Sequence, residues 1–177
     1  MLTLKSPSPH AATTTHTTIE SPLGELTTVA RSKGVAGLYF SSHWYRPDRS
    51  TFGDRAEEKF ENLRPQLSEY FAGERQGFDI SLDANGDELH RKVWDLVRQV
   101  PYGQTSTYGQ LARELGDGTT LRAVGAAVGR NPLCILIPCH RIVGANGKLT
   151  GYAGGLRRKQ FLLDLETTTA ERPSRLF

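Results

Sequence analysis

Residues 131–143 read Asn-Pro-Leu-Cys-Ile-Leu-Ile-Pro-Cys-His-Arg-Ile-Val, and the second half of the expected fold is arranged around them. The apolar run at 135–137 ends at Pro138, which predicts a short buried strand. Cys139, His140 and Arg141 follow directly after that strand. A thiolate is a strong nucleophile, and an adjacent base or cation increases its population at neutral pH. The stretch therefore indicates a nucleophilic site; the alternative is a packing cysteine beside a surface histidine.

Two short helices, joined by a glycine-containing turn, are predicted before this stretch. The first covers 108–115 and begins after Thr107, which has Gln110 three residues later, the spacing of a capping box. The second covers 120–130, with Thr119 as its predicted cap. The pair has the outline of a helix-turn-helix, with an ordinary αα-hairpin as the alternative.

The second of these helices is rich in small residues. Residues 122–130 read Arg-Ala-Val-Gly-Ala-Ala-Val-Gly-Arg. Because Gly inside a helix costs about 1 kcal/mol relative to Ala, this composition suggests that another backbone or a ligand approaches closely. The approach is either to another helix or to a nucleic-acid groove. Arg122 and Arg130 at the two ends suit contacts with phosphates or bases.

Helical patterns also lie on both sides of these two helices. Apolar residues recur at helical spacing over 89–100. After the cysteine, residues 151–155 predict a flexible loop and residues 156–166 a final helix. Three basic residues at 157–159 fall in the first turn, the unfavourable end for the helix dipole. They are either solvated or in contact with a polyanion.

The first half of the chain instead predicts a small sheet domain. Short runs of β-forming residues alternate with turn residues, and a helix that Pro65 kinks or divides is expected over 54–72. The predicted strands cover residues 19–21, 26–30, 35–40 and 78–82. A turn or linker follows at 83–86.

These patterns together predict an α+β fold. We expect a small N-terminal α/β domain with an antiparallel sheet, and a mostly helical C-terminal domain that contains the helix-turn-helix. The predicted divisions are a disordered lead-in over 1–17, the N-terminal domain over 18–83, the C-terminal domain over 87–166 and a tail over 167–177.

The composition narrows the possible classes of function. The 177-residue chain has a net charge of +3, and residues 87–166 hold 11 Lys or Arg and 7 Asp or Glu, a net +4 (11 − 7). This bias suits a polyanionic partner. Two cysteines without a CxxC pair fit a reducing compartment and predict neither a disulfide scaffold nor a zinc site. Since no apolar run approaches the roughly 18 residues that span a bilayer and no secretory signal is visible, a cytoplasmic location is expected.

The strongest motif is Pro138-Cys-His-Arg-Ile-Val143, with Asn131-Pro132 before it and Gly151-Tyr-Ala-Gly-Gly-Leu156 after it. Three further matches are Val100-Pro-Tyr-Gly103, Tyr108 and Arg122-Ala-Val-Gly125. Together these motifs resemble the O6-alkylguanine-DNA alkyltransferases, also called methylated-DNA–protein-cysteine methyltransferases. The resemblance covers roughly residues 19–166.

The resemblance implies direct reversal of DNA damage without a cofactor. Cys139 would take the alkyl group of O6-alkylguanine, or of O4-alkylthymine, in one irreversible displacement. His140 would activate the thiol through a bridging water, and Glu166 would orient the imidazole, the role of the third group in a triad. Asn131 would stabilise the turn that places Cys139, and Tyr108 would help rotate the target nucleotide and protonate the leaving guanine. Each molecule would act once, as a suicide enzyme.

The resemblance also implies binding to double-stranded DNA through the minor groove, with the damaged guanine rotated out of the stack. Arg122 would fill the gap that the flipped base leaves. The implied DNA-contacting residues are Arg122, Ala123, Gly125, Ala126, Gly129 and Arg130. The implied guanine pocket consists of Tyr152, Ala153 and Gly154. A monomer with no metal and no membrane partner is expected, and cooperative binding on DNA is left open.

Two positions depart from some members of the family. Cys134 stands where some relatives have Pro, and Ala153 where some have Ser, which puts one hydrogen bond near the guanine O6 in question. Two rival functions stay open from the residues alone. One is a cysteine hydrolase that uses Cys139 and His140, and the other is a non-enzymatic DNA-binding regulator built on the helix-turn-helix.

Overall fold

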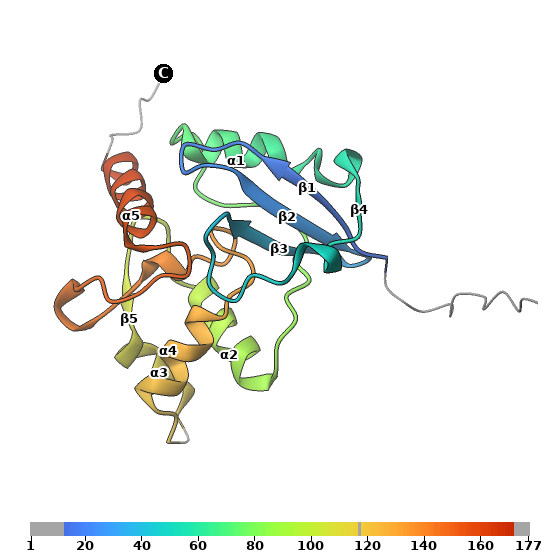
Figure 1. The fold of residues 1–177 in the computed structure, drawn as a ribbon. Helices are drawn as coiled ribbons and strands as arrows, with labels where there is room; N and C mark the ends of the chain where they lie inside the picture. Colours follow the sequence, from blue (N-terminus) through green and yellow to red (C-terminus); the bar gives the residue numbers. More distant parts are fainter. Residues whose placement is uncertain (1–12, 117, 172–177) are drawn as a thin grey trace, which may run out of the picture.

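The computed structural model describes residues 13–116 and 118–171, which form a sheet part and a helical part (Figure 1). The sheet has four strands in the order β3-β2-β1-β4. Antiparallel pairing joins β1 (Thr15–Ile19) to β2 (Leu26–Arg31) and β2 to β3 (Gly34–Phe40). The two-residue β4 (Asp54–Arg55) pairs parallel to β1. The predicted α+β class is confirmed, and β4 adds one short parallel pairing to the antiparallel sheet.

The first strand begins earlier than the sequence predicted. β1 ends at Ile19, so the prediction of a strand over 19–21 was wrong in its position. Residues 15–17 pair with β2, although they were predicted to belong to a disordered lead-in. Threonine is β-branched and favours strands, so the Thr-rich composition that suggested disorder is compatible with this pairing. Residues 1–12 of the predicted lead-in lie outside the described residues.

A single helix, α1 (Leu63–Phe71), packs against the sheet where a kinked or divided helix over 54–72 was predicted. Residues 57–60 form a separate 3-10 turn, and the two residues of β4 precede it. Pro65 lies in the first turn of α1, where the backbone N–H would have no partner within the helix. The proline therefore fits the start of the helix and causes no kink.

The predicted strand over 78–82 is reduced to a single bridge between Val35 and Leu82. The N–H of Val35 donates to the Ser81 carbonyl at 2.9 Å, so this segment does lie along β3. Gly34 makes the approach possible, because a Cβ at this residue would lie 2.2 Å from the Ser81 oxygen. The prediction of a strand was wrong, but the segment occupies the edge of the sheet.

Three helices form the helical part: α2 (Glu88–Arg98), α3 (Tyr108–Leu115) and α4 (Leu121–Gly129). The predicted capping box is present, since the Thr107 side chain accepts from the Gln110 N–H and the Gln110 side chain accepts from the Thr107 N–H. Thr120, and not Thr119 as predicted, caps α4 by accepting from the Ala123 N–H at 3.1 Å. Helices α3 and α4 pack together as the predicted helix-turn-helix.

The apolar run of the 131–143 stretch is a buried turn, so the prediction of a strand was wrong. Residues 134–136 form the turn, and Ile135 has a φ of 72°. This left-handed conformation is rare for a β-branched residue and is held here by its surroundings. A bridge between Leu133 and Leu38 and a 2.8 Å hydrogen bond from the Leu38 N–H to the Pro132 carbonyl tie the turn to β3. The turn thus joins the helical part to the sheet.

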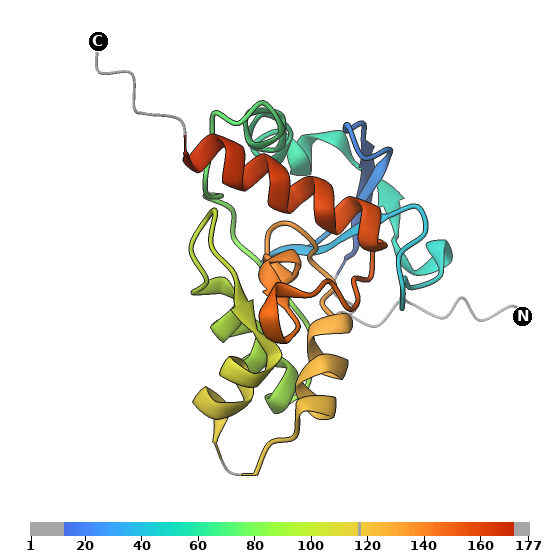
Figure 2. The ribbon, with the colours of Figure 1, turned by 90° about the vertical axis from the view of Figure 1, so that its left-hand side faces the viewer.

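The last helix, α5 (Leu156–Ala170), contacts both parts of the molecule (Figure 2). The Arg158 side chain donates to the Leu23 carbonyl in the sheet part, and Gly103 of the helical part packs against Ala170. The helix continues four residues beyond the predicted end at 166, so part of the predicted tail is helical. Residues 172–177 lie outside the described residues.

Buried side chains from both parts form one continuous core, which includes Leu38 of β3, Val93 of α2 and Leu133 of the turn. None of the described helices combines the length and the apolar character that crossing a bilayer requires. Among residues 13–116 and 118–171, no group of three or more His, Cys, Asp or Glu side chains is arranged to hold a metal ion.

The Leu38→Ala substitution should lower the free energy of unfolding by about 2–5 kcal/mol, because it leaves a cavity where the two parts share their core. Leu38 has no exposed surface. Equilibrium denaturation in guanidinium chloride measures the change. Leu121→Ala is the matched control at a 60% exposed site and should stay within about 0.5 kcal/mol of the wild type. An equal loss of unfolding free energy in Leu38→Ala and Leu121→Ala would contradict a core that the two parts share.

Candidate active site

Cys139 begins a 3-10 turn, η3 (Cys139–Arg141), and is 3% exposed. Its sulfur accepts a hydrogen bond of 3.1 Å from the Asn131 Nδ2. The same amide nitrogen donates to the Ile137 carbonyl, and the Asn131 oxygen accepts from the Leu133 N–H. Asn131 therefore holds both ends of the buried turn and contacts the sulfur directly.

The surroundings of Cys139 favour its thiolate. The Cys134 sulfur lies 4.0 Å from the Cys139 sulfur, and its S–H lowers the pKa of Cys139. Burial raises the pKa, but the Asn131 amide and the charge of Lys159 lower it further, so the net direction is downward. Burial raises the pKa of Cys134 well above its usual value, so this second sulfur stays a thiol and acts as a donor.

A buried carboxylate, Glu166, lies behind the cysteine turn and has no exposed surface. It accepts hydrogen bonds from side chains of α1 and η3 and from the backbone of the loop before α3. The donors are Tyr70 Oη (2.7 Å), His140 Nε2 (2.8 Å), Arg141 Nε (2.8 Å), Arg141 Nη2 (2.9 Å) and the Gly103 N–H (3.3 Å). Burial alone would raise the pKa of Glu166, but the bonds and charges of His140 and Arg141 outweigh it and lower the pKa to about 2.

The carboxylate fixes the tautomer of His140. An ionised carboxylate only accepts hydrogen bonds, so the proton of the neutral imidazole lies on Nε2. Burial lowers the pKa of His140 more than Glu166 raises it, which keeps the ring neutral near pH 7. The other ring nitrogen, Nδ1, is buried and has no hydrogen-bond partner among the described residues. It is therefore a free acceptor for a proton.

Lys159 is a site residue that the sequence did not identify. It was grouped with two arginines as solvated or in contact with a polyanion, but it has no exposed surface. Its Nζ donates to the carbonyls of Ile142 and Gly151, and burial lowers its pKa to about 8. The sequence contains a signal for this burial, because Lys159, Leu162 and Glu166 recur at spacings of three and four, and all three lie on the buried face of α5.

A small cavity of about 60 Å³ leads to Cys139. It brings together six residues of the sequence prediction with three that were not predicted. The predicted residues are Tyr108, Gly125, Gly129, Cys139, Tyr152 and Ala153, and the others are Trp44, Val128 and Gly151. Gly154, which was predicted for the guanine pocket, does not line this cavity. A Cβ on Gly154 would lie 2.4 Å from the Phe40 ring, so this glycine allows the loop to pack on the sheet.

The predicted DNA-contacting residues lie on the accessible side of α4. Arg122, Ala126 and Arg130 are exposed at four-residue spacing, and Ala123 is partly exposed. Apart from the neighbouring backbone of α4 itself, no atom of the described residues lies within 4 Å of a Cβ built on Gly125 or Gly129. The alternative explanation of these glycines, close packing on another helix, is therefore wrong. The small residues leave open space beside the helix.

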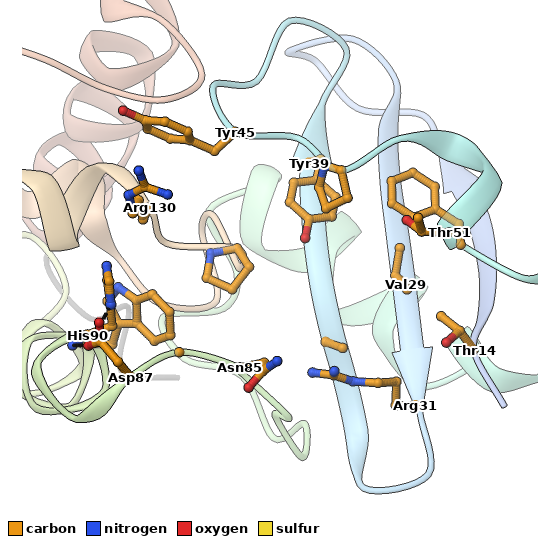
Figure 3. A pocket seen from close by; sticks show the side chains of 16 residues that line it. Thr14, Val29, Arg31, Tyr39, Tyr45, Thr51, Asn85, Asp87, His90 and Arg130 are labelled. Carbon is orange, nitrogen blue, oxygen red and sulfur yellow. Dashed lines mark hydrogen bonds and ion pairs between the residues drawn. The ribbon is translucent and has the colours of Figure 1, made fainter. Parts of the chain in front are cut away.

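A larger cavity, of about 520 Å³, lies between the sheet and the helical part (Figure 3). Figure 3 shows Tyr39 on the sheet and Asp87 and His90 on the helical side, with Tyr45 and Arg130 at one end. The Arg130 guanidinium lies 4.3 Å from the centre of the Tyr45 ring. None of the groups around Cys139 lines this cavity, so its size alone does not make it the reactive site.

The fold and the site define the class of the protein: a helix-turn-helix protein with a buried cysteine nucleophile beside its second helix. Two family profiles match this chain. One, described as "6-O-methylguanine DNA methyltransferase, DNA binding domain", matches residues 88–168. The other, described as "6-O-methylguanine DNA methyltransferase, ribonuclease-like domain", matches residues 14–84. The chain belongs to the methylated-DNA–protein-cysteine methyltransferase family.

Individual relatives agree with the profiles. The methylated-DNA–protein-cysteine methyltransferase of Mycolicibacterium paratuberculosis is 46% identical over 149 residues, which cover 84% of this chain and 90% of the relative. The crystal structure of Mycobacterium tuberculosis OGT in complex with DNA is 41% identical, with a TM-score of 0.83, and the match covers 88% of this chain and 94% of that one. An O6-methylguanine DNA methyltransferase from Methanococcus jannaschii has a TM-score of 0.62 at 30% identity, over 91% of this chain and 98% of that one.

Glu166 should stay ionised down to about pH 2. Its folded pKa lies below the ordinary 4.5, so ionisation stabilises the folded state. This stability, on the order of 3 kcal/mol, is present above about pH 4.5 and is lost as the pH falls toward 2. A ¹³C NMR titration of the glutamate carboxyls, with Glu166→Gln to assign the signal, measures the pKa. A midpoint at or above 4.5 would contradict the hydrogen-bonded cluster.

Proposed function

We propose that this protein repairs O6-alkylguanine in DNA by direct reversal, transferring the alkyl group to Cys139. The observation that carries the proposal is the position of the Cys139 sulfur, at the end of a cavity that helix α4 lines and in front of the His140–Glu166 pair. The names of the relatives, which specify methylated DNA as donor and a protein cysteine as acceptor, support the same reaction. O4-alkylthymine also carries its alkyl carbon on an oxygen attached to the ring, so the proposal includes it as a substrate.

The reaction is one displacement at the alkyl carbon. The Cys139 proton passes to His140 Nδ1 through a bridging water, since the imidazole and the sulfur are not hydrogen-bonded directly. A lone pair of the Cys139 sulfur forms the new carbon–sulfur bond while the carbon–O6 bond breaks. The electron pair of the broken bond stays on O6, so guanine leaves as an anion. Tyr108 protonates the leaving base. Burial raises the pKa of Tyr108, so the phenol holds its proton at neutral pH until the guanine anion forms.

The damaged base reaches the sulfur by leaving the DNA stack. The accessible side of α4 lies in the minor groove, where small residues allow the helix to approach the DNA backbone. Arg122 occupies the gap in the stack, and the base enters beside Tyr152. The cavity of about 60 Å³ is smaller than the roughly 300–1,000 Å³ of ordinary ligand pockets, so its walls move apart when the base enters.

The protein is used once. The product is a thioether, and no described residue provides a chemical route to cleave it. The molecule acts as a monomer inside the cell, where its substrate is located. The two rival functions predict different outcomes: a cysteine hydrolase would turn over repeatedly, and a DNA-binding regulator would not need a reactive Cys139.

Incubation with a duplex that contains O6-methylguanine, followed by mass spectrometry, tests the proposal. We expect one methyl group per protein molecule, located on Cys139, because the thioether does not release it. Cys139→Ser should carry no methyl group. Cys134→Ser is the matched control and should still accept one on Cys139. Product formation beyond one equivalent, or a methyl group on another residue, would contradict the proposal.

Arg122→Ala tests whether Arg122 fills the gap that the flipped base leaves in the DNA stack. The substitution should slow repair of O6-methylguanine in duplex DNA by about 5- to 150-fold, which corresponds to the roughly 1–3 kcal/mol of a lost DNA contact. Reaction with a free O6-alkylguanine base should change less than twofold, because a free base has no stack to leave. Rates from quenched-flow experiments on both substrates provide the comparison. Equal losses on the two substrates would exclude the gap-filling role.

A further inference from the structure

Trp44 lines the cavity that leads to Cys139, although it belongs to the sheet part of the chain. It lies in the loop after β3 and is 53% exposed. Large apolar side chains with this much exposure are few among the described residues, and Trp44 is the one that shares a cavity with the reactive sulfur. The mechanism described above does not use it.

The loop around Trp44 is held in place on both sides. The Trp44 N–H donates to the Ala153 carbonyl at 3.0 Å, which joins the loop to the segment that carries Tyr152. The preceding His43 is buried and packs its ring edge-on against Tyr39, with centroids 5.1 Å apart. On the other side the following residue, Tyr45, stacks with the Arg130 guanidinium (Figure 3). These contacts anchor the backbone on both sides of Trp44, so they fix the position from which the indole extends.

The indole lines the cavity next to the loop before Tyr152. The ring edge lies 3.9 Å from the position that a Cβ on Gly151 would occupy, so it covers the loop before Tyr152. Gly125 and Gly129 of α4 line the same cavity, and outside the neighbouring backbone of α4 no described atom lies within 4 Å of a Cβ built on either glycine. A planar group that entered this cavity to reach the sulfur would lie against its lining, which includes the indole.

We propose that Trp44 is a substrate-contacting wall of the acceptor pocket, on which the everted 6-alkoxypurine stacks while its alkyl carbon meets Cys139. The inference rests on the proposed function and deepens it. Aromatic side chains stack on bases without regard to sequence, which suits a pocket that recognises a damaged base in any context. The sheet part thus contributes a side chain to binding of the base.

The rate of Cys139 alkylation by free O6-benzylguanine, followed by intact-protein mass spectrometry, tests the inference without DNA. Trp44→Ala should lower the second-order rate constant about tenfold, within the roughly 5- to 150-fold that removal of one base–aromatic stack produces. Trp44→Phe keeps a ring and should lose less than about threefold. Phe161→Ala, a 38% exposed aromatic that does not line the cavity, is the matched control and should react as the wild type does.

Tryptophan fluorescence gives a second readout that a structural role would not change. The chain has two tryptophans, and the other, Trp94, is 3% exposed with its indole N–H bound to the Ala127 carbonyl. O6-benzylguanine should quench the emission of Cys139→Ser, and the quenching should disappear in Cys139→Ser with Trp44→Phe. The quenching experiment tests contact between Trp44 and the base even when Trp44→Ala does not fold.

The outcomes separate the inference from the function on which it rests. Absence of methyl transfer from the O6-methylguanine duplex to Cys139 of the wild type would overturn the proposed function. Alkylation of the wild type, with Trp44→Ala reacting at an equal rate and with no Trp44-dependent quenching, would overturn the inference alone. A rate loss in Trp44→Ala together with Trp44-dependent quenching supports both.

Discussion

The site depends on the hydrogen bonds and the ion pair that the Glu166 carboxylate accepts. The carboxylate is a buried charge, and an isolated buried carboxylate is costly unless other groups compensate it. Here Arg141 supplies the opposite charge in a two-point contact, and Tyr70, His140 and Gly103 supply further hydrogen bonds. Because these donors come from α1, η3 and the loop before α3, forming the cluster requires α5 to be docked against both parts of the molecule.

The same constraint organises the chemistry. Hydrogen bonding to Glu166 leaves His140 Nδ1 as a proton acceptor without a partner among the described residues. The backbone of His140 follows that of Cys139 in one turn, so fixing the ring also fixes the turn that carries the sulfur. The Cys134 S–H, the Asn131 amide and the buried ammonium of Lys159 favour the thiolate. Stability and reactivity therefore depend on one set of buried polar contacts.

The features that the sequence predicted well are local ones. Thr107 and Gln110 contact each other within one turn, so their spacing alone indicates the capping box. The turn at 134–136 could not be predicted, because the left-handed Ile135 is held by contacts with β3 that are distant in sequence. Trp44 was missed for the same reason: the cavity that contains it forms only when the sheet part meets the loop before Tyr152. The resemblance to a family identified Cys139, His140 and Glu166, but no spacing rule places Glu166 beside His140.

The most direct test of this account is ¹⁵N NMR of the His140 ring in the free protein. The account predicts a neutral imidazole near pH 7 with its proton on Nε2, bound to Glu166, and an unprotonated Nδ1. Histidine-labelled wild type, with a conservative His140→Asn variant to assign the signals, gives both the charge and the tautomer. A proton on Nδ1, or a charged ring at neutral pH, would contradict the claim that the Glu166 carboxylate prepares His140 to take the proton of Cys139.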